Sequence, residues 1–278
     1  MLKILKAGTY STIQDFGRFG HKKFGVPLAG AMDRRAMIKA NSIVGNKENE
    51  AVIEFMLQGP EIEFQAEVQF ALTGCQVDAR LNGETIQPNL LYKAKIGDHL
   101  SLTRIKNGLC GYLAVRGGFV AETVLGSKSY YPYITTQATL SVNQHILFAN
   151  EATYTNSSFG SESEENETAL ELWKGPEFEH LSAEQKSLFF SQSFKLTSQF
   201  SRMGFRTEEI SALGTKEIIT SSVQPGTVQV TPSGQLILLM RDAPTTGGYA
   251  RLGQLETKSI DKIAQKRPTE IITFTLLI

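Results

Sequence analysis

The stretch Leu238-Leu-Met-Arg-Asp-Ala-Pro-Thr-Thr-Gly-Gly-Tyr249 takes an apolar run directly into a polar turn. Ile237–Met240 is typical of a buried strand, and Pro244 ends it because proline lacks the N–H that a sheet needs. Polar groups then crowd around a bend at which Gly247 and Gly248 permit backbone angles denied to other residues. Two interpretations are open. The Asp and Thr side chains either cap the backbone of an ordinary turn, or they form a functional site at the end of the strand.

The rest of the chain repeats this alternation of short apolar segments and turns, which predicts a mainly β fold. Turn-forming residues recur about every ten positions, a rhythm typical of β-sandwiches and closed barrels. The predicted strands are Glu61–Phe64, Val68–Thr73, Leu90–Tyr92, His99–Leu102, Gly111–Val115, Phe194–Thr197, Gly226–Val230 and Ile271–Leu277. A few short helices are predicted at Asp33–Val44, Ser182–Phe189 and Ser259–Gln265. Asp33 is the expected N-cap of the first helix, and Gly45 ends it.

Size and charge place broad limits on function. The 278 residues suffice for one large domain or two of ordinary size. The 28 Lys and Arg residues balance the 28 Asp and Glu residues without a long basic block, so neither nucleic acid nor a membrane is an expected partner. Cys75 and Cys110 are the only cysteines, and Met1 leads into Lys3 and Lys6 without an apolar signal core. We therefore expect a cytoplasmic protein that binds a small molecule or another protein.

Standard linear motifs for metal and nucleotide chemistry are absent from the sequence. The histidines show no HxH, HxxxH or HExxH spacing, and the cysteines show no CxxC pairing, so no metal site is predicted. The sequence contains neither a GxxxxGK[ST] phosphate loop nor a GxSxG nucleophile turn.

A low-complexity tract divides the chain. Residues 156–168 read NSSFGSESEENET, a composition that predicts an exposed linker or loop. Gly59-Pro-Glu-Ile-Glu63 before the tract is echoed by Gly175-Pro-Glu-Phe-Glu179 after it, which is either coincidence or a remnant of duplication. We therefore predict an N-terminal β-rich unit, residues 1–155, whose residues 1–58 are able to pack across both units. Residues 169–278 are expected to form a C-terminal β-barrel unit.

The N-terminal block carries a second candidate site. Gln14-Asp-Phe-Gly-Arg-Phe-Gly20 lets the side chains of Gln14, Asp15 and Arg18 converge, because its glycines allow the chain to double back. An Arg–Asp pair held in this way either clamps a planar carboxylate or amide, or braces a long loop as a salt bridge.

Further motifs follow in a fixed order along nearly the whole chain. They are Gln14-Asp-Phe-Gly-Arg-Phe-Gly20, Gly25-Val-Pro-Leu-Ala-Gly-Ala-Met-Asp33, Ala40-Asn41, Val44-Gly-Asn46, Gly59-Pro60, Tyr112-Leu-Ala-Val-Arg-Gly-Gly118, Leu125-Gly-Ser127, Arg202-Met-Gly204, Gly226-Thr-Val-Gln229, Asp242, Thr245-Thr-Gly-Gly-Tyr249 and Ala264-Gln265. In this order they resemble the family of C-type 5-oxoprolinase subunits, also called the biotin-dependent carboxyltransferase-like, allophanate hydrolase subunit 2 or Kip-type family.

The resemblance implies two cyclophilin-like β-barrel units packed together, and a partner of related fold, the B-type 5-oxoprolinase subunit. With a third, lactam-utilisation-type subunit, such a complex opens the lactam ring of 5-oxoproline to give L-glutamate, using ATP with Mg²⁺. An unstrained amide is a poor electrophile, so phosphorylation of its carbonyl oxygen is the expected use of ATP. Charge that develops on oxygen then needs cationic or N–H donors.

Two alternative functions remain open within the same family. One is a Kip-type regulator that binds a histidine-kinase inhibitor. The other is carboxyl transfer to a urea-like amide. The sequence has no Met-Lys-Met tripeptide, so the second alternative requires biotin carried on another protein.

The resemblance also implies site residues. The catalytic candidates are Asp242, Asp33 and Arg202, with the two carboxylates polarising water or holding magnesium with the nucleotide, although Asp33 has a competing duty as an N-cap. Arginine forks and glycine N–H groups are suited to phosphate or carboxylate. The candidates for binding substrate or phosphate are Gln14, Asp15, Arg18, Arg116, Gly117, Gly118, Thr245, Thr246, Gly247, Gly248, Tyr249 and Gln265.

The sequence departs from the family pattern after Ser127. A GGxxGR segment followed by LxxGD is usual there, but residues 128–145 read KSYYPYITTQATLSVNQH, without the arginine and several of the glycines. The contribution of this loop to an anion site is therefore not carried over, and its three tyrosines offer a stacking surface for a planar ligand instead. Ser201 replaces a frequent aspartate, and Thr269 replaces a frequent glycine.

Overall fold

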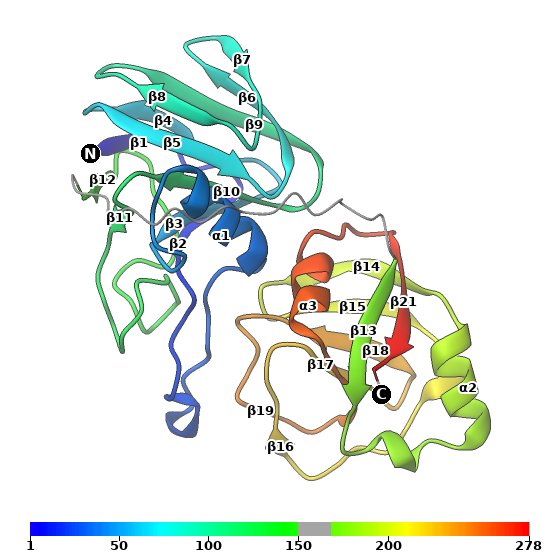
Figure 1. The fold of residues 1–278 in the computed structure, drawn as a ribbon. Helices are drawn as coiled ribbons and strands as arrows, with labels where there is room; N and C mark the ends of the chain where they lie inside the picture. Colours follow the sequence, from blue (N-terminus) through cyan, green and yellow to red (C-terminus); the bar gives the residue numbers. More distant parts are fainter. Residues whose placement is uncertain (150–167, 278) are drawn as a thin grey trace. The chain divides into compact units, whose positions relative to one another are not determined.

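The computed structural model describes residues 1–149 and 168–277. The chain divides into two compact units (Figure 1). The first contains residues 1–18 and 29–149, and the second contains residues 19–28 and 168–277. The segment 19–28 interrupts the first unit in sequence yet groups with the second. The predicted linker lies outside the described residues except for its last position.

The first unit contains two antiparallel sheets and one α-helix. Its elements are β1 (Leu2–Lys6), β2 (Tyr10–Gln14), α1 (Arg34–Ile43), β3 (Val52–Met56), β4 (Glu61–Phe64), β5 (Val68–Thr73), β6 (Gln76–Leu81), β7 (Glu84–Ile86), β8 (Leu91–Ala94), β9 (His99–Asn107), β10 (Cys110–Val115), β11 (Phe119–Val120) and β12 (His145–Phe148). The seven-stranded sheet has the order β11-β12-β1-β4-β9-β6-β7, and the five-stranded sheet has the order β2-β3-β10-β5-β8.

The two sheets enclose one hydrophobic core. Phe64 of β4 stacks on Phe70 of β5 with ring centroids 5.3 Å apart, and these strands belong to different sheets. Alternate residues of each strand point into this core, as the period of a β-strand requires. On the other face of the five-stranded sheet lies α1, where the Thr73 hydroxyl donates a hydrogen bond to the Ala36 carbonyl at 2.7 Å.

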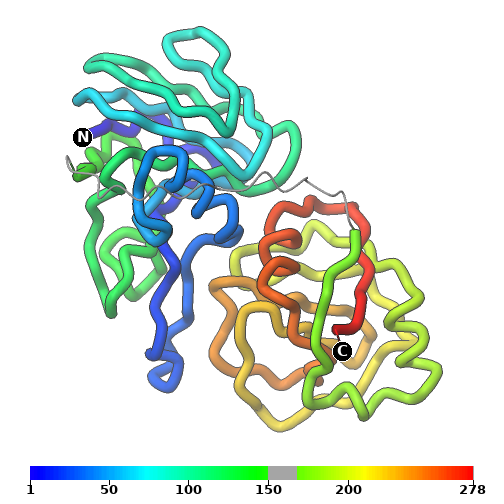
Figure 2. The backbone as a smooth tube through the Cα atoms, viewed as in Figure 1, coloured from blue at the N-terminus to red at the C-terminus, as the bar shows by residue number. Residues whose placement is uncertain are grey.

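The second unit is a closed barrel with two α-helices and three short 3-10 turns. Its elements are η1 (Lys22–Phe24), β13 (Ala169–Lys174), η2 (Phe178–His180), α2 (Ala183–Ser191), β14 (Phe194–Ser201), β15 (Gly204–Glu209), η3 (Ser211–Leu213), β16 (Ser221–Ser222), β17 (Thr227–Val230), β18 (Gln235–Leu239), β19 (Thr246–Gly247), β20 (Ala250–Leu255), α3 (Thr257–Ala264) and β21 (Ile271–Leu276). The barrel order is β13-β20-β17-β18-β15-β14-β21, and its path can be followed from green to red in Figure 2.

Parallel pairing of β13 with β21 closes the barrel, and helix α2 packs on its side. Phe189 of α2 stacks on Phe274 of β21 with ring centroids 4.8 Å apart. The N-terminus of α2 is fixed by a capping box, in which Ser182 and Gln185 each bond the other's backbone N–H. No helix within residues 1–149 and 168–277 has the length and apolar character to cross a membrane.

The mainly β fold with a few short helices is confirmed. The strands predicted at Glu61–Phe64 and Val68–Thr73 have the same bounds in the structure. The predicted strand His99–Leu102 is instead the first part of a longer strand that ends at Asn107. Asp33 caps α1 as expected, because its carboxylate accepts the Ala36 N–H at 2.9 Å. The two Gly-Pro echoes have different settings: one precedes strand β4, and the other precedes the 3-10 turn η2.

Candidate functional site

The predicted site residues fall into two groups, one in each unit. The first unit holds Gln14, Asp15, Arg18, Asp33, Arg116, Gly117 and Gly118. The second unit holds Arg202, Asp242, Thr245, Thr246, Gly247, Gly248, Tyr249 and Gln265. Each group has a geometry of its own and is described by itself.

Asp15 is a buried anchor for the loop that follows Leu125-Gly126. Its Oδ1 accepts hydrogen bonds from the Ser127 and Ser129 hydroxyls, both at 2.6 Å. The Gly17 N–H donates to the same oxygen at 2.8 Å, and the Lys128 N–H donates to Oδ2 at 2.7 Å. The carboxylate therefore fixes the start of the segment that departs from the family pattern, and two serine hydroxyls hold it there.

Gln14 and Arg18 flank Asp15 in the sequence, and both contact the same loop, Gln14 through a hydrogen bond from its Nε2 to the Tyr130 carbonyl at 3.4 Å. The Arg18 guanidinium is buried and donates to the Ser129 carbonyl. Gln14 is fully buried, and its Nε2 donates to the Thr12 hydroxyl at 3.0 Å. The structure thus brings the side chains of Gln14, Asp15 and Arg18 to one place. Among the residues that the structure describes, Gln14 Oε1 has no hydrogen-bond partner, a costly condition for a buried acceptor.

The loop after Ser127 covers the outer edge of strand β2. The Tyr130 N–H donates to the Ile13 carbonyl at 2.8 Å, and the Leu140 N–H donates to the Ser11 carbonyl, also at 2.8 Å. The Tyr130 ring is buried in the core of the first unit, which raises the pKa of its hydroxyl, whereas Tyr133 is fully exposed. These rings do not form a common stacking surface, which corrects the expectation of one.

Asp33 belongs to a buried polar network that the sequence interpretation missed. Its backbone N–H donates to the Tyr112 hydroxyl at 2.8 Å, and that hydroxyl donates to Glu54 Oε2 at 2.8 Å. Glu54 and Tyr112 are 1% and 0% exposed. Burial raises the pKa of Tyr112 well above its usual value, and the nearby Glu54 carboxylate adds to the effect. The available signal was an acidic residue inside the apolar strand sequence Val52-Ile-Glu-Phe-Met56.

The turn at Arg116–Gly118 already uses the N–H groups that the sequence suggested for an anion. The Gly117 N–H donates to Asn46 Oδ1 at 2.8 Å, and the Gly118 N–H donates to the Val115 carbonyl at 2.9 Å. Arg116 Nη1 donates to the Gln69 side chain at 2.5 Å. In this conformation the two glycine N–H groups hold the turn, and neither is directed to a ligand.

Arg202 and Asp242 form a buried, two-pronged ion pair in the second unit. Arg202 Nε and Nη2 donate to Asp242 Oδ2 and Oδ1, each at 2.9 Å. The Asp242 N–H also donates to the Arg202 carbonyl at 2.9 Å. The neighbouring Arg241 forms an ion pair with Asp261 of α3, at 2.9 Å. The Arg202–Asp242 pair therefore ties the turn between β14 and β15 to the end of β18.

The turn after Asp242 folds back onto residues 218–223. Thr246 and Gly247 form β19, which pairs with β16, and the Ile218 N–H donates to the Gly248 carbonyl at 2.9 Å. The Tyr249 ring packs on a small apolar cluster of Val223, Ile237, Leu239 and Ala243. Gln265 is the C-cap residue of α3, where its N–H donates to the Lys262 carbonyl at 3.1 Å.

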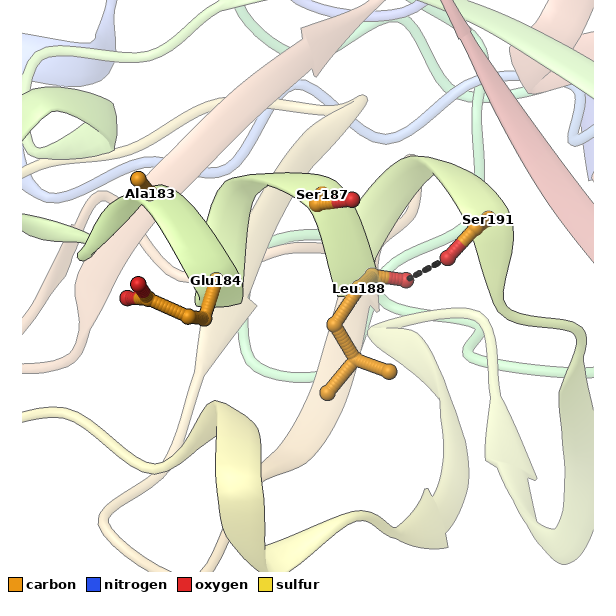
Figure 3. Close-up of a pocket in the computed structure, with 5 residues that line it drawn as sticks. All are labelled: Ala183, Glu184, Ser187, Leu188 and Ser191. Atoms are coloured by element: carbon orange, nitrogen blue, oxygen red, sulfur yellow. Dashed lines mark hydrogen bonds between the residues drawn. The ribbon is translucent and has the colours of Figure 1, made fainter.

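A shallow hollow of about 530 Å³ lies elsewhere, along the solvent-facing side of α2 (Figure 3). It is lined by Ala183, Glu184, Ser187, Leu188 and Ser191. None of these is a predicted site residue, and a single exposed helix face offers no converging polar groups. Within the described ranges, no group of three or more His, Cys, Asp or Glu side chains is arranged to hold a metal ion.

Comparisons with known proteins point to one family along nearly the whole chain. Residues 24–276 match the family "Carboxyltransferase domain, subdomain A and B". The C-type 5-oxoprolinase subunit of Escherichia coli (strain K12) is 32% identical over an alignment of 274 positions that covers 95% of this chain and 87% of that protein. Its Haemophilus influenzae counterpart is 32% identical over an alignment of 283 positions that covers 99% of this chain and 90% of that protein. A urea amidolyase of Lachancea kluyveri is 38% identical over 130 residues, which are 46% of this chain and 7% of that protein.

The fold is shared with a solved structure. The crystal structure of TTHA0988 superposes with a TM-score of 0.89 at 26% identity, over 99% of this chain. The match spans 56% of the TTHA0988 chain. The sequence identity along nearly its whole length, together with the matched carboxyltransferase domain, shows that this chain belongs to the family of C-type 5-oxoprolinase subunits.

Proposed function

We propose that this chain is part of an ATP-dependent 5-oxoprolinase complex, in which it acts with a partner like the B-type subunit and with a third, lactam-utilisation-type subunit. The reaction opens the lactam ring of 5-oxoproline to give L-glutamate. The observation that carries this proposal is the similarity to a C-type 5-oxoprolinase subunit over 95% of the chain. A cytoplasmic location remains an expectation from the sequence.

The two candidate carboxylates, Asp242 and Asp33, do not fit a magnesium–nucleotide site as they are arranged. Both Asp242 oxygens accept hydrogen bonds from Arg202, and Asp33 Oδ1 accepts the Ala36 N–H. A hard cation needs oxygen ligands that are directed to it. We therefore assign ATP and magnesium to the complex and derive no step through them on this chain.

Gln14 is the best-supported substrate contact. A lactam N–H is a donor of the kind that the buried, unpartnered Gln14 Oε1 accepts. Arg18, whose buried guanidinium donates to the Ser129 carbonyl, supplies positive charge to the same loop. We propose that this corner of the first unit holds the lactam amide while the ring is opened.

The direct test is to reconstitute the chain with both partner subunits and to measure 5-oxoproline-dependent ATP hydrolysis and glutamate release. Gln14→Met is expected to raise KM roughly tenfold, because one hydrogen bond to a buried polar group is lost. Gln65→Met is the matched control, since Gln65 Oε1 is also buried and unpartnered but lies at the end of β4. Equal effects of the two substitutions would contradict the assignment of Gln14, and absence of turnover with any partner would contradict the function.

A second candidate is carboxyl transfer to a urea-like amide, which the partial similarity to urea amidolyase favours. Its test uses the same preparation with urea and a biotin-carrying protein charged with carboxylate. Consumption of the carboxyl group with urea, and none with 5-oxoproline, would establish this reaction in place of ring opening.

A further inference from the structure

A row of polar side chains crosses the five-stranded sheet beneath helix α1. The row consists of Thr12, Glu54, Tyr112 and Thr73, which are successive cross-strand partners. The residues on either side of Glu54 in β3, Ile53 and Phe55, belong to the hydrophobic core on the opposite face. The row therefore faces α1 and the segment that leads into it.

One carboxylate oxygen in this row holds two successive backbone N–H groups, one directly and one through the Tyr112 hydroxyl. Glu54 Oε2 accepts the Met32 N–H at 2.7 Å and the Tyr112 hydroxyl at 2.8 Å. The Tyr112 hydroxyl in turn accepts the Asp33 N–H at 2.8 Å. Burying a carboxylate costs several kcal/mol, so Glu54 fills this space at a higher free-energy cost than an apolar side chain would. In exchange for this cost, the hydrogen bonds of Glu54 fix the backbone position of residues 32 and 33.

The segment held in this way is conformationally demanding. Ala29 and Gly30 have φ angles of 55° and 90°, in the left-handed region. A Cβ on Gly30 would lie 2.7 Å from the Phe16 carbonyl oxygen, so the two parts of the chain are in close contact. The Ala31 N–H donates to the Asp15 carbonyl at 2.8 Å. Segment 29–33 therefore connects the Asp15 turn, which carries Gln14, to the N-cap of α1.

We propose that Glu54 and Tyr112 are positioning residues for the reaction. They hold the Met32 and Asp33 backbone, and through it they set the place of Asp33 and of the adjoining Gln14–Asp15 turn. This inference rests on the proposed 5-oxoprolinase function. Glu54 and Tyr112 are bonded to each other and to the backbone, so their effect is on the geometry of the groups that they hold.

Substitutions at Glu54 and Tyr112 separate the effect of their hydrogen bonds from the effect of the negative charge of Glu54. Glu54→Leu removes the acceptor of both hydrogen bonds, and Tyr112→Phe removes only the link to Asp33. In Glu54→Gln an amide oxygen in place of Oε2 still accepts both. In the reconstituted complex we expect kcat to fall roughly ten- to a hundredfold in the Leu and Phe variants, with KM changed less than about threefold, because displacement of about 1 Å has effects of this size. Glu54→Gln and the control Glu63→Gln, on β4, should stay within about threefold.

Amide hydrogen exchange in the same complexes reports on the position of the segment directly. Tyr112→Phe should speed exchange at Asp33 but leave Met32 protected, and Glu54→Leu should speed both. If Glu54→Leu does not fold, Tyr112→Phe and Glu54→Gln still test the inference. The inference is overturned if exchange at Asp33 rises while kcat is unchanged, or if Glu54→Gln loses as much turnover as Tyr112→Phe. A complete absence of turnover in the unaltered complex would remove the proposed function, and this inference with it.

Discussion

At the scale of single residues, the polar side chains in the family motifs are largely occupied with each other and with the backbone. Asp15 accepts four hydrogen bonds from loop residues, and Asp242 is engaged at both oxygens by Arg202. A buried charge is tolerated only when it is paired or hydrogen-bonded. These residues therefore have a structural duty that any catalytic role must be compatible with.

Variants of the Arg202–Asp242 pair separate a structural role from a catalytic role. Arg202→Met or Asp242→Leu alone should lower the free energy of unfolding by about 3–5 kcal/mol, because each removes one member of a buried ion pair. The double variant should recover at least half of that loss, measured by urea denaturation. If the pair acts in catalysis, we expect less than ~1% of turnover in the stable double variant. Turnover near that of the unaltered complex would leave the pair with a structural role alone.

At the scale of elements, local sequence signals define where helices begin. The Ser182 N-cap and Gln185 satisfy two backbone N–H groups that the first turn of α2 would otherwise leave unpaired. Helix α2 then presents its aromatic residues to the barrel, and Ser187 faces solvent (Figure 3). One helix thus carries two serines for comparison: Ser182 at the cap and Ser187 on the exposed face.

Ser182→Ala should lower the stability of the second unit by about 1 kcal/mol, because it removes one half of the capping box. Ser187→Ala should change stability by less than about 0.5 kcal/mol, and in the favourable direction, because alanine has the higher helix propensity. Urea denaturation followed by tryptophan fluorescence measures both. Equal destabilisation by the two substitutions would refute the role of the cap.

At the scale of the whole molecule, the unfolding of the second unit can be followed by itself in solution. The single tryptophan, Trp173, lies in β13 of the second unit, so its fluorescence reports on the barrel. Close to it in the sequence, Glu177 accepts hydrogen bonds from Arg251 Nε at 2.8 Å and from Nη2 at 2.6 Å. This contact connects the turn after β13 to strand β20.

The Glu177–Arg251 pair predicts a pH dependence of barrel stability. Hydrogen bonds from the Arg251 guanidinium lower the pKa of Glu177 below its usual value. A lowered carboxyl pKa gives stability that is present above the unfolded-state value of about 4.3 and is lost as the pH falls through the folded-state value. Glu177→Gln should therefore destabilise the barrel by about 2 kcal/mol at pH 7 and reduce the loss of stability below about pH 4.

The control for this prediction is Glu171→Gln, which changes an exposed carboxylate on β13. Acid titration followed by Trp173 fluorescence compares the three proteins. An unfolding profile for Glu177→Gln that runs parallel to that of the unaltered chain would contradict the pH dependence.

Much of the fold follows from signals that are local in the sequence. The bounds of β4 and β5 were predicted from apolar alternation, and the N-cap of α1 from Asp33. Alternation did not predict that β9 continues to Asn107, because beyond Leu102 its exposed, charged residues resemble a turn. Nothing local indicated that the strands of the first unit would form two sheets around one core.

The β class, the starts of α1 and α2 and the group of polar residues at Gln14–Arg18 could be predicted from the sequence, since caps, turns and periodicity depend on neighbours a few positions away. The start of α3 was predicted at Ser259, but this helix begins at Thr257. The partners of the charged side chains became evident only in the folded chain. Asp15 meets Ser127 across 112 positions, Glu54 meets Tyr112 across 58, and Arg202 meets Asp242 across 40. These contacts depend on strand order and register, and periodicity encodes which face a residue takes but not which strand lies beside it.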